Sequence, residues 1–169
     1  RDLLFGASDA DTGETQTLSV TSVMYSVDGG TASSTAPAGV SLSGSTLTVD
    51  PTDASFSSLA TGATKTIVVS YNVTDVHGAS MTQTETVTIT GSNSAPVVTV
   101  PGNSVTINED TPVNLTGAHV SDVDSGDTQT ATLSVGHGTL TALGNGAGLT
   151  SVSGNGTNTI TLVGSTSAV

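Results

Sequence analysis

The stretch Thr86-Val87-Thr88-Ile89-Thr90 alternates strictly between hydroxyl-bearing and aliphatic side chains. Successive side chains of an extended strand point to opposite faces, so Val87 and Ile89 share one face and the three threonines share the other. This period of two predicts a strand in a sheet that has one buried side and one solvent-facing side.

The same alternation recurs along the chain. Gly, Pro, Asn and Asp residues that favour turns separate the alternating segments, and no segment shows a sustained helical period. One short helical turn is expected at residues 53–59. The sequence therefore predicts an all-β protein made of β-sandwiches, with strands at residues 17–21, 40–42, 46–49, 66–73, 86–90, 97–100, 105–107, 130–135 and 159–163.

The composition is acidic, rich in hydroxyl groups and poor in aromatic residues. The 169 residues include 14 Asp and Glu but only 2 Lys and Arg, and the formal net charge is −12. With so few basic residues, the chain has no positively charged surface of the kind that binds nucleic acid or an anionic membrane. No apolar run approaches the roughly 18 residues of a membrane span, so direct membrane insertion is not expected. The absence of cysteine excludes disulfides and thiolate metal sites.

An internal repeat divides the chain. The stretch SDADTGETQT, which starts at Ser8, matches SDVDSGDTQT, which starts at Ser121, at seven of ten positions and an offset of 113 residues. The repeat predicts two tandem modules, at residues 1–92 and 97–169, joined by a short junction at residues 93–96. Both modules are shorter than the offset. We therefore expect the first module to lack its N-terminal strand and the second to lack its C-terminal part.

Most of the carboxylates gather in a few places. With so few cations in the chain, neighbouring carboxylates repel one another, and a divalent cation would relieve that repulsion. Ca²⁺ fits best because it accepts many oxygen ligands flexibly, whereas Mg²⁺ requires stricter geometry. Zn²⁺ is disfavoured because the histidines lie far apart in sequence, at His77, His119 and His137. The competing interpretation is a set of solvated acidic turns. The candidate ligands form the cluster Asp9, Asp11 and Glu14, its copy Asp122, Asp124 and Asp127, the pair Glu109 and Asp110, and the single residue Asp75.

Catalysis has little support in the sequence. No Gly-x-Ser-x-Gly nucleophile motif occurs, although the chain contains 24 serines. Carboxylate pairs can cleave glycosides, but the chain has almost no aromatic residues to form a sugar platform. We therefore expect no enzyme activity.

Several further stretches carry a family resemblance: residues 53–62 (DASFSSLATG), 69–75 (VSYNVTD), 87–97 (VTITGSNSAPV), 108–112 (NEDTP) and 159–165 (TITLVGS). Together they resemble the VCBS and cadherin-like tandem repeat modules of bacterial RTX adhesins, which are secreted by the type I route. The resemblance implies two immunoglobulin- or cadherin-like β-sandwich modules in a secreted protein of the bacterial cell surface. It also implies Ca²⁺ ligands at Glu109, Asp110, Asp122, Asp124, Asp75 and the junction residue Asn93.

The sequence departs from the family at the junction. The family usually has Asn-Asp-Ala-Pro there, whereas this chain has Ser94 in place of the aspartate. A hydroxyl or carbonyl oxygen is a weaker calcium ligand than a carboxylate, so looser binding is expected.

The resemblance implies a calcium-rigidified extender, or spacer, that projects a ligand-binding tip in cell adhesion or biofilm formation. Its partners would be neighbouring repeat modules of the same chain, with a host or surface ligand bound through another domain, and we expect a monomer. The alternative is a calcium-dependent module that itself binds carbohydrate or peptide.

Overall fold

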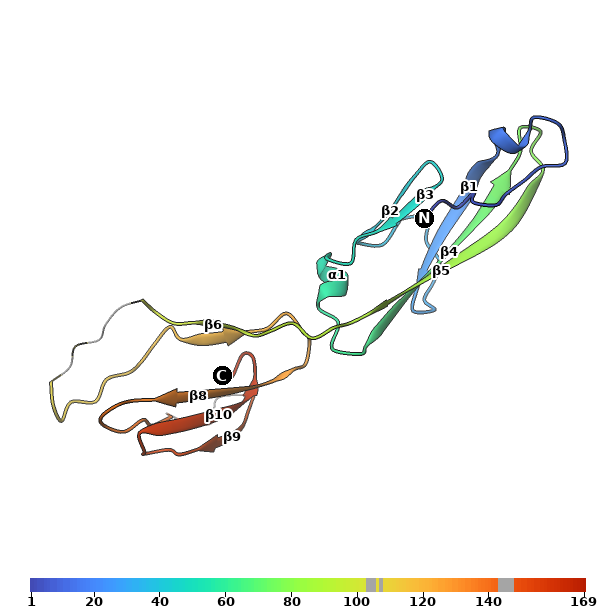
Figure 1. Cartoon of the computed structure of the whole chain (residues 1–169). Helices are drawn as coiled ribbons and strands as arrows, with labels where there is room; N and C mark the ends of the chain where they lie inside the picture. Colours follow the sequence, from blue (N-terminus) through green and yellow to red (C-terminus); the bar gives the residue numbers. More distant parts are fainter. Residues whose placement is uncertain (103–105, 107, 143–147) are drawn as a thin grey trace. The chain divides into compact units, whose positions relative to one another are not determined.

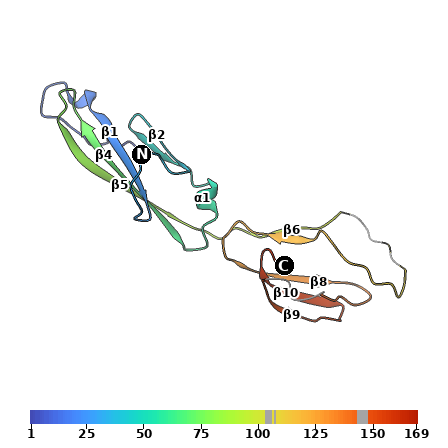
Figure 2. The same cartoon turned by 180° about the vertical axis from the view of Figure 1, so that it is seen from behind.

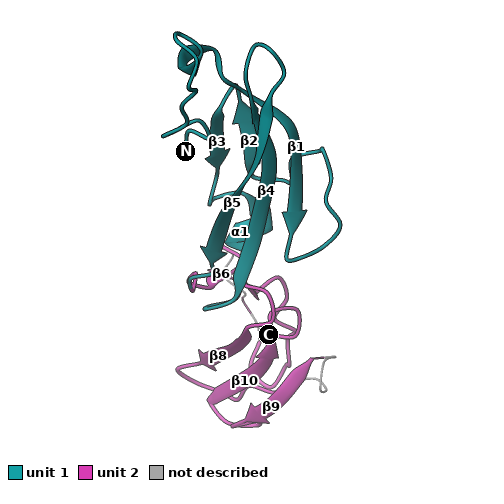
Figure 3. Cartoon of the chain, turned by 90° about the vertical axis from the view of Figure 1, so that its right-hand side faces the viewer, with its two compact units in different colours: residues 1–92 teal, residues 93–169 magenta. Residues whose placement is uncertain are grey.

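The computed structural model describes residues 1–102, 106, 108–142 and 148–169. These residues form a mostly β protein with several small antiparallel sheets (Figure 1). The chain divides into two compact units, Arg1–Ser92 and Asn93–Val169 (Figure 3). We call them unit 1 and unit 2. Residues 93–96, which the sequence analysis set apart as a junction, belong to unit 2.

Unit 1 contains a three-stranded sheet and a hairpin. The sheet has the order β1-β4-β5, with β1 at Ser19–Val27, β4 at Thr64–Thr74 and β5 at Ser80–Thr90. The hairpin pairs β2 (Val40–Ser43) with β3 (Thr46–Val49). The hairpin lies beside the sheet in views from opposite sides (Figures 1 and 2). A 3₁₀ turn at Thr15–Thr17 precedes β1.

The core of unit 1 forms where the sheet meets the hairpin. On the central strand β4, Ile67, Val69 and Tyr71 alternate with less buried residues, as the period of two predicts. The hydroxyl group of Tyr71 donates a hydrogen bond to the Leu3 carbonyl oxygen at 3.1 Å, and burial raises the pKa of Tyr71. The buried cluster is Leu3, Tyr25, Val40, Leu47, Phe56, Ile67, Val69 and Tyr71.

A single-turn helix, α1 (Ala54–Ser57), adds Phe56 to this core. Asp53 caps the helix: its Oδ1 accepts hydrogen bonds from the Ser55 amide at 2.9 Å and the Ser55 hydroxyl at 2.7 Å. These bonds lower the pKa of Asp53 because they favour its ionised form. Gly39 has a φ of +74°, and a Cβ there would clash with the Phe56 ring, so glycine is required at this position.

Unit 2 has two small sheets. One has the order β8-β10-β9, with β8 at Thr128–Ser134, β10 at Thr159–Ser165 and β9 at Leu149–Ser153. The other pairs β6 (Val97–Thr99) with β7 (His119–Ser121). Apolar side chains on and near β6 and β7 are exposed: Val97, Val98, Val100, Val113, Leu115 and Val123. Within the described part of unit 2, the buried residues with large side chains are Ile160, Asp124 and Gln129.

All eight predicted strands that lie wholly on described residues are found, with shifted ends. β1 extends well past residue 21, and β5 starts at Ser80, six residues before the predicted strand. The short strands β7 and β9 were not predicted. Two of the three residues of the strand predicted at 105–107, residues 105 and 107, lie outside the described part of the chain. No helix in the described residues is both long and apolar enough to cross a membrane.

Candidate metal centres

The loop before the 3₁₀ turn brings three acidic side chains of unit 1 together. Asp9 Oδ1 accepts a hydrogen bond from the Asp11 amide at 2.9 Å, and the Asp9 amide donates to the Thr15 hydroxyl at 2.9 Å. Gly13 closes the loop with a φ of +88°. Ligand atoms of Asp9, Asp11 and Glu14 consequently lie within 4.8 Å of one another. This acidic cluster can hold a metal ion.

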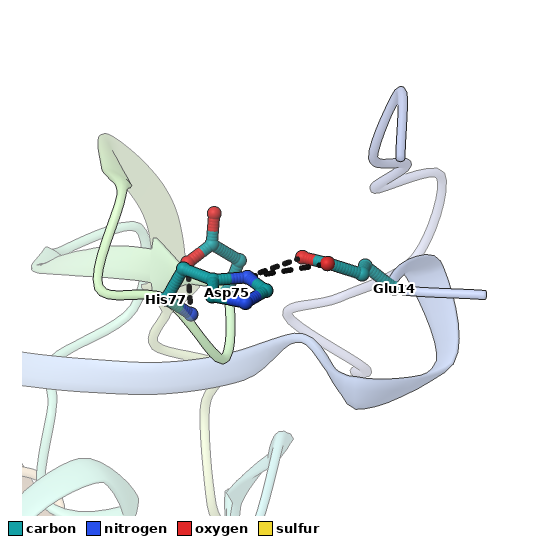
Figure 4. Close-up of side chains that lie close together, drawn as sticks. All are labelled: Glu14, Asp75 and His77. Atoms are coloured by element: carbon teal, nitrogen blue, oxygen red, sulfur yellow. Dashed lines mark hydrogen bonds and ion pairs between the residues drawn. The ribbon is translucent and has the colours of Figure 1, made fainter. Parts of the chain in front are cut away.

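The β4–β5 turn brings a second set of ligands to the same loop. Asp75 Oδ1 accepts hydrogen bonds from the His77 amide at 2.8 Å and the Ala79 amide at 2.9 Å. Gly78 has a φ of +90°, which this tight turn requires. His77 thereby faces Glu14, with its Nδ1 atom 3.2 Å from Oε1 and 3.3 Å from Oε2 (Figure 4). Ligand atoms of Glu14, Asp75 and His77 lie within 4.8 Å of one another.

Unit 2 holds a different arrangement around Asp124. This residue is only 2% exposed, although it carries a carboxylate. Its Oδ2 accepts a hydrogen bond from the Ser94 amide at 2.5 Å, whereas its buried Oδ1 has no hydrogen-bond partner among the residues that the structure describes. A buried carboxylate oxygen without a partner carries a desolvation cost, and a cation would offset that cost.

Asp122 contacts Asp124, and each of its two carboxylate oxygens accepts a hydrogen bond. Its Oδ1 accepts a hydrogen bond from the Asp124 amide at 3.0 Å, and its Oδ2 accepts one from the Gln129 side-chain amide at 3.0 Å. The Asn93 side chain donates through Nδ2 to the Ser94 carbonyl oxygen at 2.8 Å. The Oδ1 atom of Asn93 remains available as an acceptor. Hydrogen bonds thus link Asp122 with Asp124 and Gln129, and link Asp124 with Ser94, the residue after Asn93. The side-chain oxygens of Asp122, Asp124, Asn93 and Gln129 are an oxygen-rich set of potential ligands.

The other predicted ligands do not join these groups in the described residues. Asp127 is half-buried, and it does not form a group of three with Asp122 and Asp124 whose ligand atoms lie within 4.8 Å. Glu109 and Asp110 are exposed in the segment between β6 and β7, and Asp110 has a φ of +60°. The two copies of the acidic motif therefore differ: the first gathers three carboxylates, and the second buries one of them.

Two features were missed from the sequence. His77 was set aside because the three histidines lie far apart, yet the turn places it against Glu14, 63 residues away. Its position two residues after Asp75, already a candidate, was the signal that could have identified it. Gln129 was also overlooked, although it belongs to the repeated motif through its match with Gln16.

A groove of about 530 Å³ in unit 1 lies next to the acidic residues. Asp9 and Asp75 line it together with apolar side chains that include Leu3, Phe5, Tyr71 and Met81. Phe5 is 86% exposed and Met81 is 67% exposed, so both can contact a ligand. The groove joins apolar surface to carboxylates from both acidic groups of unit 1.

No family model matches this chain, and neither a curated protein nor a solved structure shows significant similarity to it.

Proposed function

We propose that this chain is a calcium-stabilised spacer segment of a secreted bacterial surface adhesin. Its two units would be tandem immunoglobulin- or cadherin-like β-sandwich modules, and neighbouring repeats of the same chain would be their partners. In this role the segment would project a separate ligand-binding tip for adhesion or biofilm formation. It would act as structure and would carry out no chemistry of its own.

The buried Asp124 carboxylate carries the proposal. Its Oδ1 has no hydrogen-bond partner among the described residues, and its backbone amide donates to Asp122. Asp122 and Asp124 belong to the motif that recurs in unit 1 with Asp9 and Asp11. Asp122, Asp124 and Gln129 carry carboxylate and amide oxygens, which are the usual protein ligands of Ca²⁺. Lys and Arg number only two in the whole chain, so protein cations are scarce as an alternative source of positive charge.

Ion binding at Asp124 would couple to folding. A ligand that binds only the folded state stabilises it by about 2.7 kcal/mol when present at 100 times its dissociation constant. Unit 2 has few buried apolar side chains in its described part, so a gain of this size matters there. Because Ser94 donates to Asp124, the ion would also hold the first residues of unit 2 in place. Low cytosolic calcium would keep the module weakly folded, and external calcium would favour folding outside the cell.

Thermal unfolding in calcium and in chelator tests this proposal. The native chain should melt at a higher temperature in millimolar calcium, and Asp124→Asn should lose most of that increase. Asp50→Asn is the control, because it removes an exposed carboxylate outside every candidate ligand group and keeps the oxygen that accepts the Thr52 amide. A melting temperature that does not respond to calcium would refute the stabilising role. Scattering dimensions that stay constant between calcium and chelator would refute rigidification.

The groove in unit 1 favours a second candidate, a module that binds carbohydrate or peptide with the help of calcium. Asp9 and Asp75 line the groove, and each also belongs to one of the two acidic groups of unit 1. An ion held by either group could therefore contact a ligand bound in the groove. A glycan array probed with the soluble chain in calcium and in chelator separates the two functions. Reproducible hits that require calcium and are lost in Asp75→Asn would favour the binding module over the spacer.

A further inference from the structure

We propose that Glu14, Asp75 and His77 form a cation site of unit 1 that takes Zn²⁺, or a divalent transition-metal ion of similar chemistry, in preference to Ca²⁺. This site differs in ligand type and location from the oxygen-rich set around Asp124 in unit 2. It does not depend on the proposed spacer function.

The ligands come from two segments that are each held by their own hydrogen bonds. Glu14 lies within the loop that Asp9 and Thr15 close, and its amide donates to the Asp11 carbonyl oxygen at 3.2 Å. Asp75 and His77 sit in the β4–β5 turn, where Asp75 Oδ1 accepts two backbone amides. The backbone on both sides is therefore ordered before any ion binds, which lowers the entropy cost of forming the site.

The distances suit a small ion that bonds to nitrogen and oxygen. Zinc–nitrogen and zinc–oxygen bonds of about 2.0–2.1 Å place two ligand atoms of a tetrahedron roughly 3.3 Å apart. His77 Nδ1 lies 3.2 Å and 3.3 Å from the two carboxylate oxygens of Glu14. Asp75 supplies the third ligand within 4.8 Å.

The imidazole decides which class of cation binds. Ca²⁺ takes six to eight oxygen ligands and gains little from a ring nitrogen, whereas imidazole is a common ligand for zinc, copper, iron and nickel. Asp9 and Asp11 share Glu14 as a neighbour, so they add negative potential near the site, and solvent can supply a fourth ligand. One imidazole and two carboxylates with a fourth oxygen make a set that Zn²⁺ accepts.

The exposure of the three residues leaves the site open to an ion from solvent. The His77 side chain is 74% exposed, so packing does not fix its ring, and the ring can turn to present either nitrogen. The Glu14 side chain is 17% exposed and holds its carboxylate toward the histidine. A plain hydrogen-bonded pair between Glu14 and His77 is the competing explanation, and it predicts no binding of metal.

Calorimetric titration of Zn²⁺ into the metal-free full chain tests the site. We expect His77→Ala to weaken the strongest zinc binding at least about tenfold, a loss typical of disturbed metal sites. Asp75→Asn should weaken it as well, and this change keeps the oxygen that accepts the turn amides. The matched control is His137→Ala, which removes an exposed histidine from unit 2. The His77→Ala chain should keep its circular dichroism spectrum, because the side chain is mostly exposed.

Two further measurements separate this site from the calcium proposal. The ring nitrogens of His77 should shift in NMR spectra when zinc is added and stay unchanged when calcium is added. Calcium binding in unit 2 should be unaffected by His77→Ala. The inference fails if His77→Ala and the native chain bind zinc equally, or if His137→Ala loses as much. It also fails if Asp124→Asn abolishes zinc binding while His77→Ala does not.

Discussion

Units 1 and 2 carry copies of the same acidic motif on very different interiors. Unit 1 has a core of eight buried apolar residues that includes Tyr25, Phe56 and Tyr71. In the described part of unit 2, Ile160 is the buried large apolar residue, and Asp124 and Gln129 are buried with it. Unit 1 is stabilised mainly by apolar burial, which contributes about 1.5–3 kcal/mol per large side chain. Unit 2 depends more on how its buried polar groups are satisfied.

The largest effect should come from truncating the centre of the unit 1 core. Ile67 is 1% exposed on the central strand β4, and Ile67→Ala should cost about 2–5 kcal/mol of unfolding free energy. Both tyrosines of the chain lie in unit 1, so tyrosine fluorescence in a urea titration reports this unit. Ile160→Ala makes the same change in unit 2 and should move the tyrosine transition much less. An equal shift from both variants would show that the two units unfold together.

Glycines that face backbone atoms give a comparable change in each unit. A Cβ at Gly91 would collide with the carbonyl oxygens of Leu59 and Ala60, and one at Gly164 would lie 2.6 Å from the Gly148 carbonyl oxygen. Replacement by alanine should cost about 1–3 kcal/mol at each site, because backbone must move. The control is Gly136→Ala, where a Cβ meets no atom within 4 Å. Melting curves of the three variants should show the control nearest to the native chain.

The effect of Asp124→Asn on the stability of unit 2 should have opposite signs in chelator and in calcium. In chelator the variant should be more stable by about 1–3 kcal/mol, because an amide avoids burying an unpartnered charge and keeps an acceptor for the Ser94 amide. In calcium it should be less stable, because a ligand is lost. Hydrogen exchange of the β8 and β10 amides reports unit 2 directly. A loss of stability in both conditions would mean that Oδ1 of Asp124 has another partner in solution.

The smallest effect concerns the acid stability of unit 1. Hydrogen bonds from Ser55 hold the pKa of Asp53 below its ordinary value of 3.8. The carboxylate of Asp53 therefore binds a proton more tightly in the unfolded chain than in the folded chain. Its contribution to the free energy of unfolding is present above pH 3.8, the ordinary pKa, and is lost as the pH falls through the lower pKa of the folded state. Asp53→Asn keeps the capping oxygen but cannot ionise, so the acid limb of the tyrosine-detected transition should become slightly shallower. An unchanged limb would assign the acid sensitivity to other carboxylates.

The sequence predicted strands best where the alternation was strict and one face was buried. The strand β3 and the second half of β5 are examples, since Leu47 and Val49 in β3, and Val87 and Ile89 in β5, alternate with threonines. It failed for β7 and for the first half of β5, where Ser80, Met81 and Gln83 are exposed and show no alternation. Backbone pairing with β4 makes that part of β5 a strand, because main-chain hydrogen bonds do not depend on side-chain pattern.

The acidic motif was found from the sequence because repetition is visible in a linear string. The burial of its carboxylates was not predictable, because burial depends on which residues pack around each copy of the motif. Asp11 is exposed beside Asp9 and Glu14, whereas its counterpart Asp124 is buried and accepts a hydrogen bond from the Ser94 amide. The encounter of His77 with Glu14 has the same origin, since the β4–β5 turn brings two distant segments together.

The sequence by itself determined the β class, the acidic surface and the duplicated motif. Each of these follows from local order: side-chain period sets the strands, composition sets the charge, and repetition marks the copies. Only the tertiary structure decided which carboxylates meet, which one is buried without a partner, and that a histidine joins them. Those outcomes depend on contacts between residues far apart in the chain, and such contacts are fixed by packing and backbone pairing rather than by neighbouring residues.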